Sequence, residues 1–371
     1  MTKLWILLAV SLLMAAVIDR RDYRLQCTRN RQREYLVTSI LIVVLGFFCG
    51  LRTWGNDTAT YLEIYEYLTP VWSEITPENT PDFAYGIGFF YVCSILKTLG
   101  FSSQDYLMFF AFATAIPYVL FVRRYSRSMV FGVFLMFTTG FYTFSMAAIK
   151  QCMATGICLM GLNYALDKKW IRYCLMIGLA SLFHPYALVY LLVPLMMFKQ
   201  WSNRTYIYIG IFVAAGFFLD TLIGTVLDIT TMMGASYDKE SFVGEGVNIF
   251  RVAVSFVPLL LAALCGKKLF ENSTKADDLM FNLAMLNALI MFVGLFGTAN
   301  YFARLANYFL PAQVIVLPWI LGKMHRKDKT WLISVCVVGY LGYFIYENAI
   351  IRPFDTGYSH MSFWDYIFNL I

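Results

Sequence analysis

The sequence predicts an all-α polytopic membrane protein, and three observations support that prediction. Of the 371 residues, 60% are hydrophobic and only 14% are charged, whereas a soluble globular protein has about 25% charged residues. The apolar residues form long runs that lack the polar–apolar alternation of barrel strands. In lipid, backbone groups must bond to one another, so these runs are predicted to be helices. Such a composition excludes a cytoplasmic enzyme, a secreted disulfide scaffold and a disordered chain.

About twelve of the apolar runs are predicted to be transmembrane helices, since a crossing takes about 20 residues. They cover residues 4–18, 35–51, 105–122, 129–145, 147–166, 172–184, 185–198, 205–227, 249–265, 279–297, 302–322 and 331–350. The sequence shows no internal repeat or linker that would divide them. Residues 1–371 are therefore predicted to form a single transmembrane domain.

The first run is predicted to be an uncleaved helix. Residues 4–18 could pass for a signal peptide, but the charges of Arg20, Arg21 and Arg24 follow the apolar run and do not precede it. This order predicts a helix whose N-terminus lies outside the cell.

Two segments depart from a simple crossing. Residues 83–99 follow a long polar loop and are predicted to be re-entrant or interfacial. Residues 172–184 and 185–198 are predicted to form a tight hairpin broken at Pro185, because proline cannot continue a helix. Each arm rises only about 20 Å, short of the roughly 30 Å hydrocarbon core. The vertex at His184 is therefore expected below the outer surface, where irregular backbone lines protein or a wet cavity.

The positions of lysine and arginine predict the orientation, because cytoplasmic loops carry an excess of both. The segments predicted to be inside hold 21 of the 29 basic residues. These segments are 19–34, 123–128, 167–172, 199–204, 266–278 and 323–329. The split becomes 12 inside and 17 outside if 83–99 crosses fully, and 16 and 13 if 172–198 is one helix. The first arrangement fits the rule best and places both termini outside.

Two loops and the C-terminal tail are predicted on the extracytoplasmic side. The loop at 52–82 carries six acidic residues against the single base Arg52, with aromatic residues throughout. The loop at 228–248 is polar and contains glycines, which is typical of a mobile lid. The tail covers residues 351–371. The net charge of +6 is dispersed and indicates topology, so no nucleic-acid partner is expected.

No cofactor and no metal ion are predicted. The eight cysteines form no CxxC pair and lie mostly within apolar runs, where they are expected to pack as apolar side chains. The three histidines are scattered, and the chain contains no HExxH, GxSxG or P-loop pattern. No inward cluster of carboxylates suggests a metal site.

Four cations lie at helix ends that face outside, against the orientation rule: Arg52, Lys150, Arg251 and Arg304. His184 lies toward the same side. Cations in apolar segments usually face a bundle interior or a wet cavity, so these five groups are expected to form one basic pocket open to the outer leaflet. Alternatively, a single arginine can snorkel to the headgroups, and His184 can serve the structure alone.

A cluster of arginine and lysine at the outer face suits phosphate oxygens. A polyprenyl diphosphate that carries a sugar chain supplies the phosphate from the lipid and the reactant from the water. No nucleotide is available outside the cell, so the donor must be linked to lipid. Asp57 is either part of this site or only the N-cap of a helix at 58–68. The loop aromatics either contact sugars or form an ordinary interfacial belt.

Several short motifs follow one another along residues 36–310. They are Gly-Leu-Arg at 50–52, Gly55-x-Asp57-x-x-x-Tyr61, Lys150–Gln151, Ala-Ser-Leu-Phe-His at 180–184 with Ala187–Leu188, and the helix of Arg304. Through them the chain resembles the EpsG/Wzy-type polysaccharide polymerases of bacterial envelopes, which have the membrane glycosyltransferase fold called GT-C. It departs from that family in having Lys150 where arginine is usual, and Pro185 where a small hydroxyl residue often follows the histidine.

The resemblance implies glycosyl transfer at the extracytoplasmic face of the bacterial inner membrane. A hydroxyl of one lipid-linked repeat unit attacks the anomeric carbon of a glycan on undecaprenyl diphosphate, with inversion, and the lipid diphosphate leaves. His184 is the first candidate for the base and Asp57 the second. The candidate clamp on the diphosphate consists of Arg52, Lys150, Arg251 and Arg304. The candidate contacts to the glycan are Trp54, Tyr61, Gln151 and Tyr308.

The implied product is capsular polysaccharide, exopolysaccharide or O-antigen. The implied partners are the lipid-linked donor and acceptor, the bilayer, and a chain-length regulator and flippase of the same pathway. Three alternatives remain open. A lipid-linked oligosaccharide flippase or exporter would want cations along a path through the bilayer, and a membrane acyltransferase would take its acyl donor from the cytoplasmic side. An O-antigen ligase shares the fold and the clamp and differs only in its acceptor.

Overall fold

The computed structural model describes residues 1–22, 28–76, 86–219, 221, 223, 245–324 and 326–355. These residues are largely helical and include no strand, which confirms the predicted all-α membrane fold. Within these described ranges, four helices are long and apolar enough to cross a membrane, or five if a bent pair is one span. The other apolar helices are shorter, so the number of crossings stays a prediction. Parts of both predicted loops, of the segment 83–99 and of the tail lie outside the described residues, at 77–85, 224–244 and 356–371.

The chain divides into two compact units. The first comprises Met1–Leu191 and Phe344–Ile371, and the second comprises Leu192–Tyr343. Each unit is described by itself, and the expected single transmembrane domain stays a prediction.

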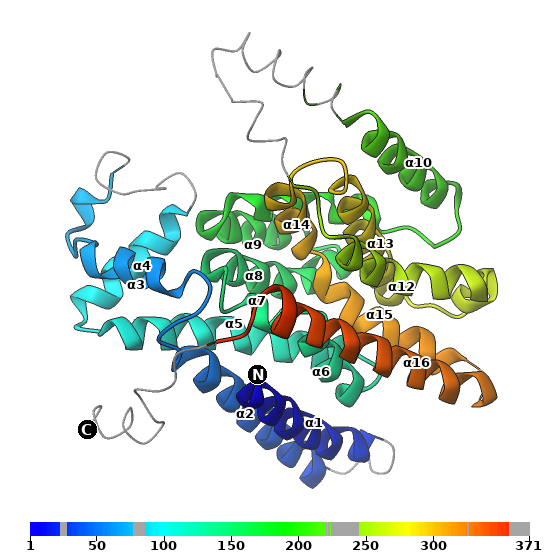
Figure 1. Cartoon of the computed structure of the whole chain (residues 1–371), viewed down its shortest axis with the longest axis horizontal. Coiled ribbons are helices and arrows are strands. Elements are labelled where there is room, and N and C mark those ends of the chain that lie inside the picture. The colour runs from blue at the N-terminus through cyan, green and yellow to red at the C-terminus, as the bar shows by residue number, and fades with distance from the viewer. Residues whose placement is uncertain are drawn as a thin grey trace. The chain divides into compact units, whose positions relative to one another are not determined.

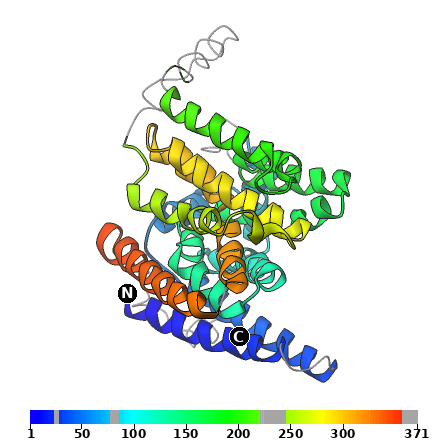
Figure 2. The same ribbon diagram turned by 90° about the vertical axis from the view of Figure 1, so that its right-hand side faces the viewer.

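The first unit contains the helices from α1 to α9 (Figure 1). Their bounds are α1 Thr2–Asp22, α2 Thr28–Gly50, α3 Thr58–Tyr67, α4 Ile87–Thr98, α5 Ser103–Tyr125, α6 Met129–Thr138, α7 Phe141–Phe144, α8 Ile149–Leu166 and α9 Trp170–Phe183, with a 3₁₀ turn at Trp72–Glu74. α2 packs along α5, α8 along α9, and α1 along α2 and α6. Figures 1 and 2 both show α1 and α2 side by side. The predicted run at 129–145 is divided into α6 and α7, because Gly140 adopts a left-handed conformation (φ 81°).

A carboxylate on α1 connects this helix to α6. Asp19 accepts hydrogen bonds from the Ser128 hydroxyl (2.8 Å) and from the backbone nitrogens of Met129 (2.7 Å) and Val130 (2.9 Å). These nitrogens belong to the first turn of α6, where backbone donors lack helical partners. The negative charge also complements the N-terminal end of the helix dipole. Asp19 therefore explains how α1 is held against α6.

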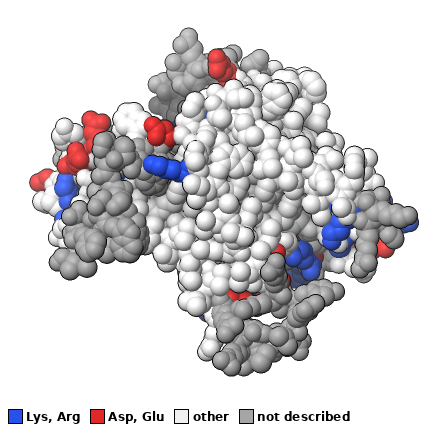
Figure 3. Space-filling view, turned by 60° about the horizontal axis from the view of Figure 1, so that its bottom comes forward, with Lys and Arg blue, Asp and Glu red and all other residues white. Residues whose placement is uncertain are grey.

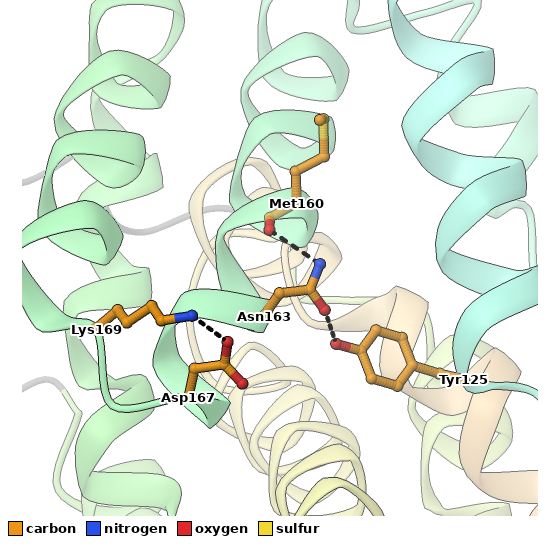
Figure 4. Close-up of polar contacts among 5 residues, drawn as sticks. All are labelled: Tyr125, Met160, Asn163, Asp167 and Lys169. Atoms are coloured by element: carbon orange, nitrogen blue, oxygen red, sulfur yellow. Dashed lines mark hydrogen bonds and ion pairs between the residues drawn. The ribbon is translucent and has the colours of Figure 1, made fainter.

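The turn between α8 and α9 carries a small polar cluster (Figure 4). Tyr125 at the end of α5 donates to the Asn163 side-chain oxygen, and the Asn163 amide donates to the Met160 carbonyl at 3.4 Å. Lys169 donates to Asp167 at 2.8 Å, and this ammonium lowers the pKa of the exposed Asp167 carboxyl. The cluster lies at a predicted cytoplasmic segment and connects α5 to α8.

The segment predicted to be re-entrant or interfacial contains the short helix α4. Its 12 residues rise only about 18 Å, which is too little for a crossing. The N-terminal end of α4 packs closely on the end of α9. A Cβ atom on Gly88 would lie 2.9 Å from the Leu182 Cβ, and one on Gly86 would lie 2.7 Å from the Phe183 carbonyl oxygen. Only glycine allows this approach of the two chain segments.

Lys97 connects α4 to α3. Its Nζ donates to the carbonyls of Tyr65 (3.0 Å), Glu66 (2.6 Å) and Leu68 (2.8 Å). An ammonium has three donors, so these bonds saturate it, and its charge complements the C-terminal end of α3. Burial raises the pKa of Tyr65 to about 12, so its hydroxyl stays protonated and donates to the Phe101 carbonyl at 2.8 Å. This cation of the predicted outer side thus has a structural role.

The chain turns back at Pro185, as the predicted hairpin requires. α9 ends at Phe183, and Pro185–Met196 form a 3₁₀ segment. The hydroxyl of Tyr173, near the start of α9, donates to the carbonyl of Tyr190. A continuous helix would separate these residues by about 25 Å, so the contact needs a reversal of the chain.

The second unit is built around α13, Lys275–Val293, which is buried along most of its length. The other helices are α10 Asn203–Phe217, α12 Ile249–Cys265, α14 Ala299–Asn307, α15 Leu310–Lys323 and α16 Arg326–Ile345, with a 3₁₀ turn at Lys267–Phe270. A π-helical turn at Tyr346–Ile351, in the first unit, follows α16 along the chain. α13 packs against α10, α12, α14 and α15.

The predicted run at 302–322 is divided into α14 and α15. The two helices are bent by 52° relative to each other. Pro311, at the start of α15, explains the break. Proline lacks the N–H group that would bond four residues back, and its ring collides with the carbonyl at that position, which here belongs to Asn307.

Charged side chains are sparse over the described part of the face drawn in Figure 3. Broad areas in Figure 3 carry no lysine, arginine, aspartate or glutamate. Large apolar side chains such as Leu13, Ile171 and Leu264 are exposed instead. Such a surface suits lipid tails and agrees with the predicted membrane class.

Candidate functional site

Arg52 follows α2 and is only 1% exposed. Its Nε donates to the Thr58 hydroxyl at 3.0 Å. Its Nη1 donates to the carbonyl oxygen of Cys49 at 2.6 Å and contacts the sulfur of the same residue at 3.3 Å. These bonds connect the end of α2 to the first residue of α3 and hold the guanidinium in one place.

The second terminal nitrogen of Arg52, Nη2, is buried and has no hydrogen-bond partner among the described residues. No carboxylate of that part of the chain pairs with the guanidinium. A buried charge is costly unless it is paired and hydrogen-bonded. Because Nε and Nη1 already bond to the protein, Nη2 is the group through which Arg52 can bind an anion in this conformation.

Lys150 lies in the first turn of α8 and is 8% exposed. Its Nζ lies over the ring of Phe90, 4.4 Å from the centroid, and over that of Phe89 at 5.1 Å. Aromatic faces attract an ammonium, by up to about 2 kcal/mol where water is excluded. Both rings belong to α4, so this short helix positions the candidate clamp lysine.

His184 directly follows the last residue of α9 and has an extended backbone (φ −157°, ψ 119°). It is 9% exposed. Its backbone nitrogen donates to the Ala180 carbonyl at 3.1 Å, and its own carbonyl accepts from the Ala187 nitrogen at 3.0 Å. The imidazole meets the Tyr186 ring edge to face, with centroids 5.0 Å apart. The predicted base thus lies buried at the hairpin vertex.

The predicted loop residues differ in exposure. Asp57 is exposed at the N-cap position of α3, but its side chain makes no capping hydrogen bond. Trp54 is 60% exposed. Tyr61 is partly buried and its ring lies 5.9 Å from that of Phe89. Asp57 therefore occupies the N-cap position, as the capping alternative expects, but its carboxylate does not make the capping hydrogen bond.

Contacts through α3 and α4 join the candidate residues of the first unit. Arg52 bonds to the start of α3, Tyr61 on α3 meets Phe89 on α4, and the Phe89 ring lies beneath Lys150. The glycine before α4 packs against both the Lys150 side chain and the carbonyl that precedes His184. The structure therefore brings Arg52, Lys150 and His184 to the elements around α4.

Two of the predicted glycan contacts are buried. Gln151, beside Lys150 on α8, is 2% exposed, and Tyr308, between α14 and α15, is 0% exposed. A glycan could meet them only within the protein interior. Their role in binding stays a prediction.

The remaining two clamp candidates lie in the second unit. Arg251 is partly buried in the first turn of α12, and its backbone nitrogen donates to the Asn248 carbonyl at 3.0 Å. Arg304 is exposed on α14. The two units are described separately, so a pocket shared by all five cationic groups stays a prediction.

Among the residues that the structure describes, three or more His, Cys, Asp or Glu do not come together as a metal site. The candidate site offers organic cations, which can bind phosphate oxygens directly. Independence from a metal ion stays a prediction.

Buried amides are the polar residues that the sequence analysis missed. Gln200, Asn282, Asn287 and Gln313 are each at most 5% exposed. They bond to one another in pairs and to backbone carbonyls. An unpaired amide in an apolar environment costs free energy. The two asparagines in the apolar run MFNLAMLNALIMF at 280–292 therefore indicate, from the sequence alone, amides that bond to buried polar groups.

The model of the EpsG family matches residues 35–368 of the chain. This range includes every candidate residue named above. No curated protein matches the chain, and no solved structure matches it.

Proposed function

The chain belongs to the EpsG family and is a membrane protein of the polysaccharide-polymerase type, and from that premise we propose that it polymerises lipid-linked oligosaccharide repeat units on the extracytoplasmic face of the bacterial inner membrane. The donor is a growing glycan on undecaprenyl diphosphate. The acceptor is a single repeat unit on the same lipid. The product is capsular polysaccharide, exopolysaccharide or O-antigen.

The proposed step is an inverting glycosyl transfer. A hydroxyl oxygen of the acceptor forms a bond to the anomeric carbon of the donor. The bond from that carbon to the phosphate oxygen breaks, and its electron pair leaves with undecaprenyl diphosphate. The hydroxyl proton passes to a base, for which His184 is the first candidate and Asp57 the second. Negative charge grows on the leaving diphosphate, so fixed cations aimed at it lower the barrier.

The observation that carries the proposal is the state of Arg52. Its guanidinium is 1% exposed, and its Nη2 has no partner among the described residues. A phosphate oxygen would supply both the missing hydrogen-bond acceptor and the missing countercharge. Bonds to Thr58 and Cys49 hold the guanidinium in advance, so little conformational freedom is lost on binding.

Lys150 and His184 support the same assignment. Phe89 and Phe90 hold the Lys150 ammonium in a buried position, where its attraction for a diphosphate is stronger than in water. His184 lies at a helix end beside Pro185, within the same unit. A flippase needs neither a base nor a clamp at one depth, so this grouping favours a transferase.

The proposal is tested with purified protein in liposomes that contain the lipid-linked donor and acceptor. We expect glycan chains that lengthen by whole repeat units, with one undecaprenyl diphosphate released for each unit joined. Arg352→Ala is the control, because Arg352 is exposed and lies outside the candidate clamp. Transport of single units across the bilayer without lengthening or diphosphate release would contradict the proposal and indicate a flippase.

A deletion strain gives an independent result. We expect single repeat units on undecaprenyl diphosphate to accumulate at the extracytoplasmic face, since their synthesis and export do not need the polymerase. Accumulation of these units on the cytoplasmic face would contradict the proposal.

A further inference from the structure

The central helix of the second unit carries two asparagines. Each donates hydrogen bonds to backbone carbonyls at a place where another helical segment ends. Asn282 and Asn287 are both 0% exposed on α13. Asn282 donates to the carbonyls of Met196 (2.6 Å) and Phe198 (2.8 Å), where the 3₁₀ segment ends. Asn287 donates to the Ala306 carbonyl at 2.7 Å, in the last turn of α14.

Asn287 gives the last turn of α14 a second hydrogen-bond donor. The bend at Pro311 interrupts the helical ladder between α14 and α15. The Ala306 carbonyl accepts one hydrogen bond from the Phe309 backbone nitrogen at 2.9 Å. A carbonyl oxygen has two lone pairs, and the Asn287 amide on α13 is the second donor to it.

Gln313 fixes the direction of the Asn287 amide. Its Nε2 donates to the Asn287 oxygen at 2.6 Å and to the Ser255 carbonyl at 2.9 Å. A reversed Asn287 amide would place its oxygen against the Ala306 carbonyl and its nitrogen against the Gln313 donor, so both bonds would be lost. Side chains and carbonyls from α12, α13, α14 and α15 thus form one buried chain of hydrogen bonds.

Backbone hydrogen bonds hold the segments at the other end of α14. The Ala299 nitrogen donates to the Glu245 carbonyl at 2.9 Å, and the Val247 nitrogen donates to the Gly294 carbonyl at 2.7 Å. The hydrogen bond from the Asn287 side chain to the Ala306 carbonyl lies in the same turn as Arg304, two residues away. The direction in which Arg304 leaves the helix therefore depends on how this last turn is held.

We propose that Asn287 is a positioning residue. Its amide, oriented by Gln313, holds the Ala306 carbonyl and thereby directs Arg304 toward the lipid diphosphate. This inference rests on the proposed function, in which Arg304 belongs to the clamp. It assigns to Asn287 no contact with substrate.

The test compares Asn287→Ala with Asn282→Ala, a matched control of equal burial on the same helix. Hydrogen–deuterium exchange of the full-length protein in detergent is measured first. Asn287→Ala should raise the exchange rate of the amides of α14 about tenfold or more, whereas Asn282→Ala should raise it near residues 196–200. An unchanged rate in α14 would overturn the proposal. If Asn287→Ala is not recovered folded, Gln313→Leu replaces it, with the same pattern expected at a smaller amplitude.

Kinetics in liposomes then separate positioning from simple destabilisation. For folded protein, Asn287→Ala should lower kcat/KM for the donor about tenfold, and Asn282→Ala should leave it within about twofold of wild type. In an Arg304→Ala background Asn287→Ala should cause no further loss. Additive losses would overturn the proposal. An Arg304→Ala protein with full activity would instead contradict the clamp of the proposed function, and the exchange rates would still report whether Asn287 holds α14.

Discussion

Replacement of Arg52 should separate its role in folding from its role in binding the diphosphate. Within the protein it donates to two oxygen atoms, on Thr58 and on Cys49. At about 1 kcal/mol of net stability each, Arg52→Ala should lower the free energy of unfolding by about 2 kcal/mol. The lost bond from Nη2 to a phosphate oxygen is charge-assisted, at about 1.5–3 kcal/mol, so kcat/KM for the donor should fall about 10- to 150-fold.

Two further variants assign these losses. Thr58→Val keeps the shape of the side chain but removes the Nε acceptor, so it should cost about 1 kcal/mol of stability and leave Nη2 available to the ligand. Arg52→Lys keeps the charge, but one nitrogen cannot serve Thr58, Cys49 and a phosphate together. Its activity should lie between wild type and Arg52→Ala.

The assay measures thermal unfolding in detergent and, for the folded fraction, kcat/KM in liposomes. A wild-type kcat/KM for the donor in Arg52→Ala would refute a role of Nη2 in binding the diphosphate. An equal loss of kcat/KM in Thr58→Val and Arg52→Ala would also refute it, because the role of Arg52 would then be to join α2 to α3.

Three other expectations can be checked directly. His184→Gln should keep expression and donor binding but lower turnover about 10²–10⁴-fold, because an amide cannot take up the proton; a purified protein that polymerises at near the wild-type rate would exclude His184 as the base. Lys150→Arg should still form polymer and Lys150→Met should not, since the first keeps a cation over the α4 rings; polymer of normal length from the methionine variant would contradict this role. Cysteines placed at Trp170 and Arg326 should resist labelling from outside intact cells, and labelling at either position would contradict the topology.

Much of the fold follows from rules that act along the chain. Composition alone indicates the membrane class, because too few polar side chains are present to cover a soluble surface. The break at Pro185 was predictable because proline removes a backbone donor wherever it stands in a helix. The same rule applied to Pro311, yet residues 302–322 were predicted to be one helix. That prediction rested on hydropathy, which counts apolar side chains and takes no account of backbone hydrogen bonds.

The candidate site was only partly predictable. The sequence singles out Arg52, Lys150 and His184 because an ionisable group in an apolar run is costly at any depth. It could not show that Arg52 has two nitrogens bound and one open, since that depends on a hydroxyl six residues away and on the path of the turn between them.

The sequence by itself determined the membrane class, the family and the set of cations, because each depends on residue type and order. Only the tertiary structure decided what those groups touch. The sequence assigns no role to Lys97, and in the structure its ammonium bonds to three carbonyls about 30 residues earlier. Asn282 and Asn287 are similar in sequence, yet only Asn287 bonds to the helix of Arg304. A hydrogen bond depends on distances of about 3 Å, and such distances are set by how helices pack.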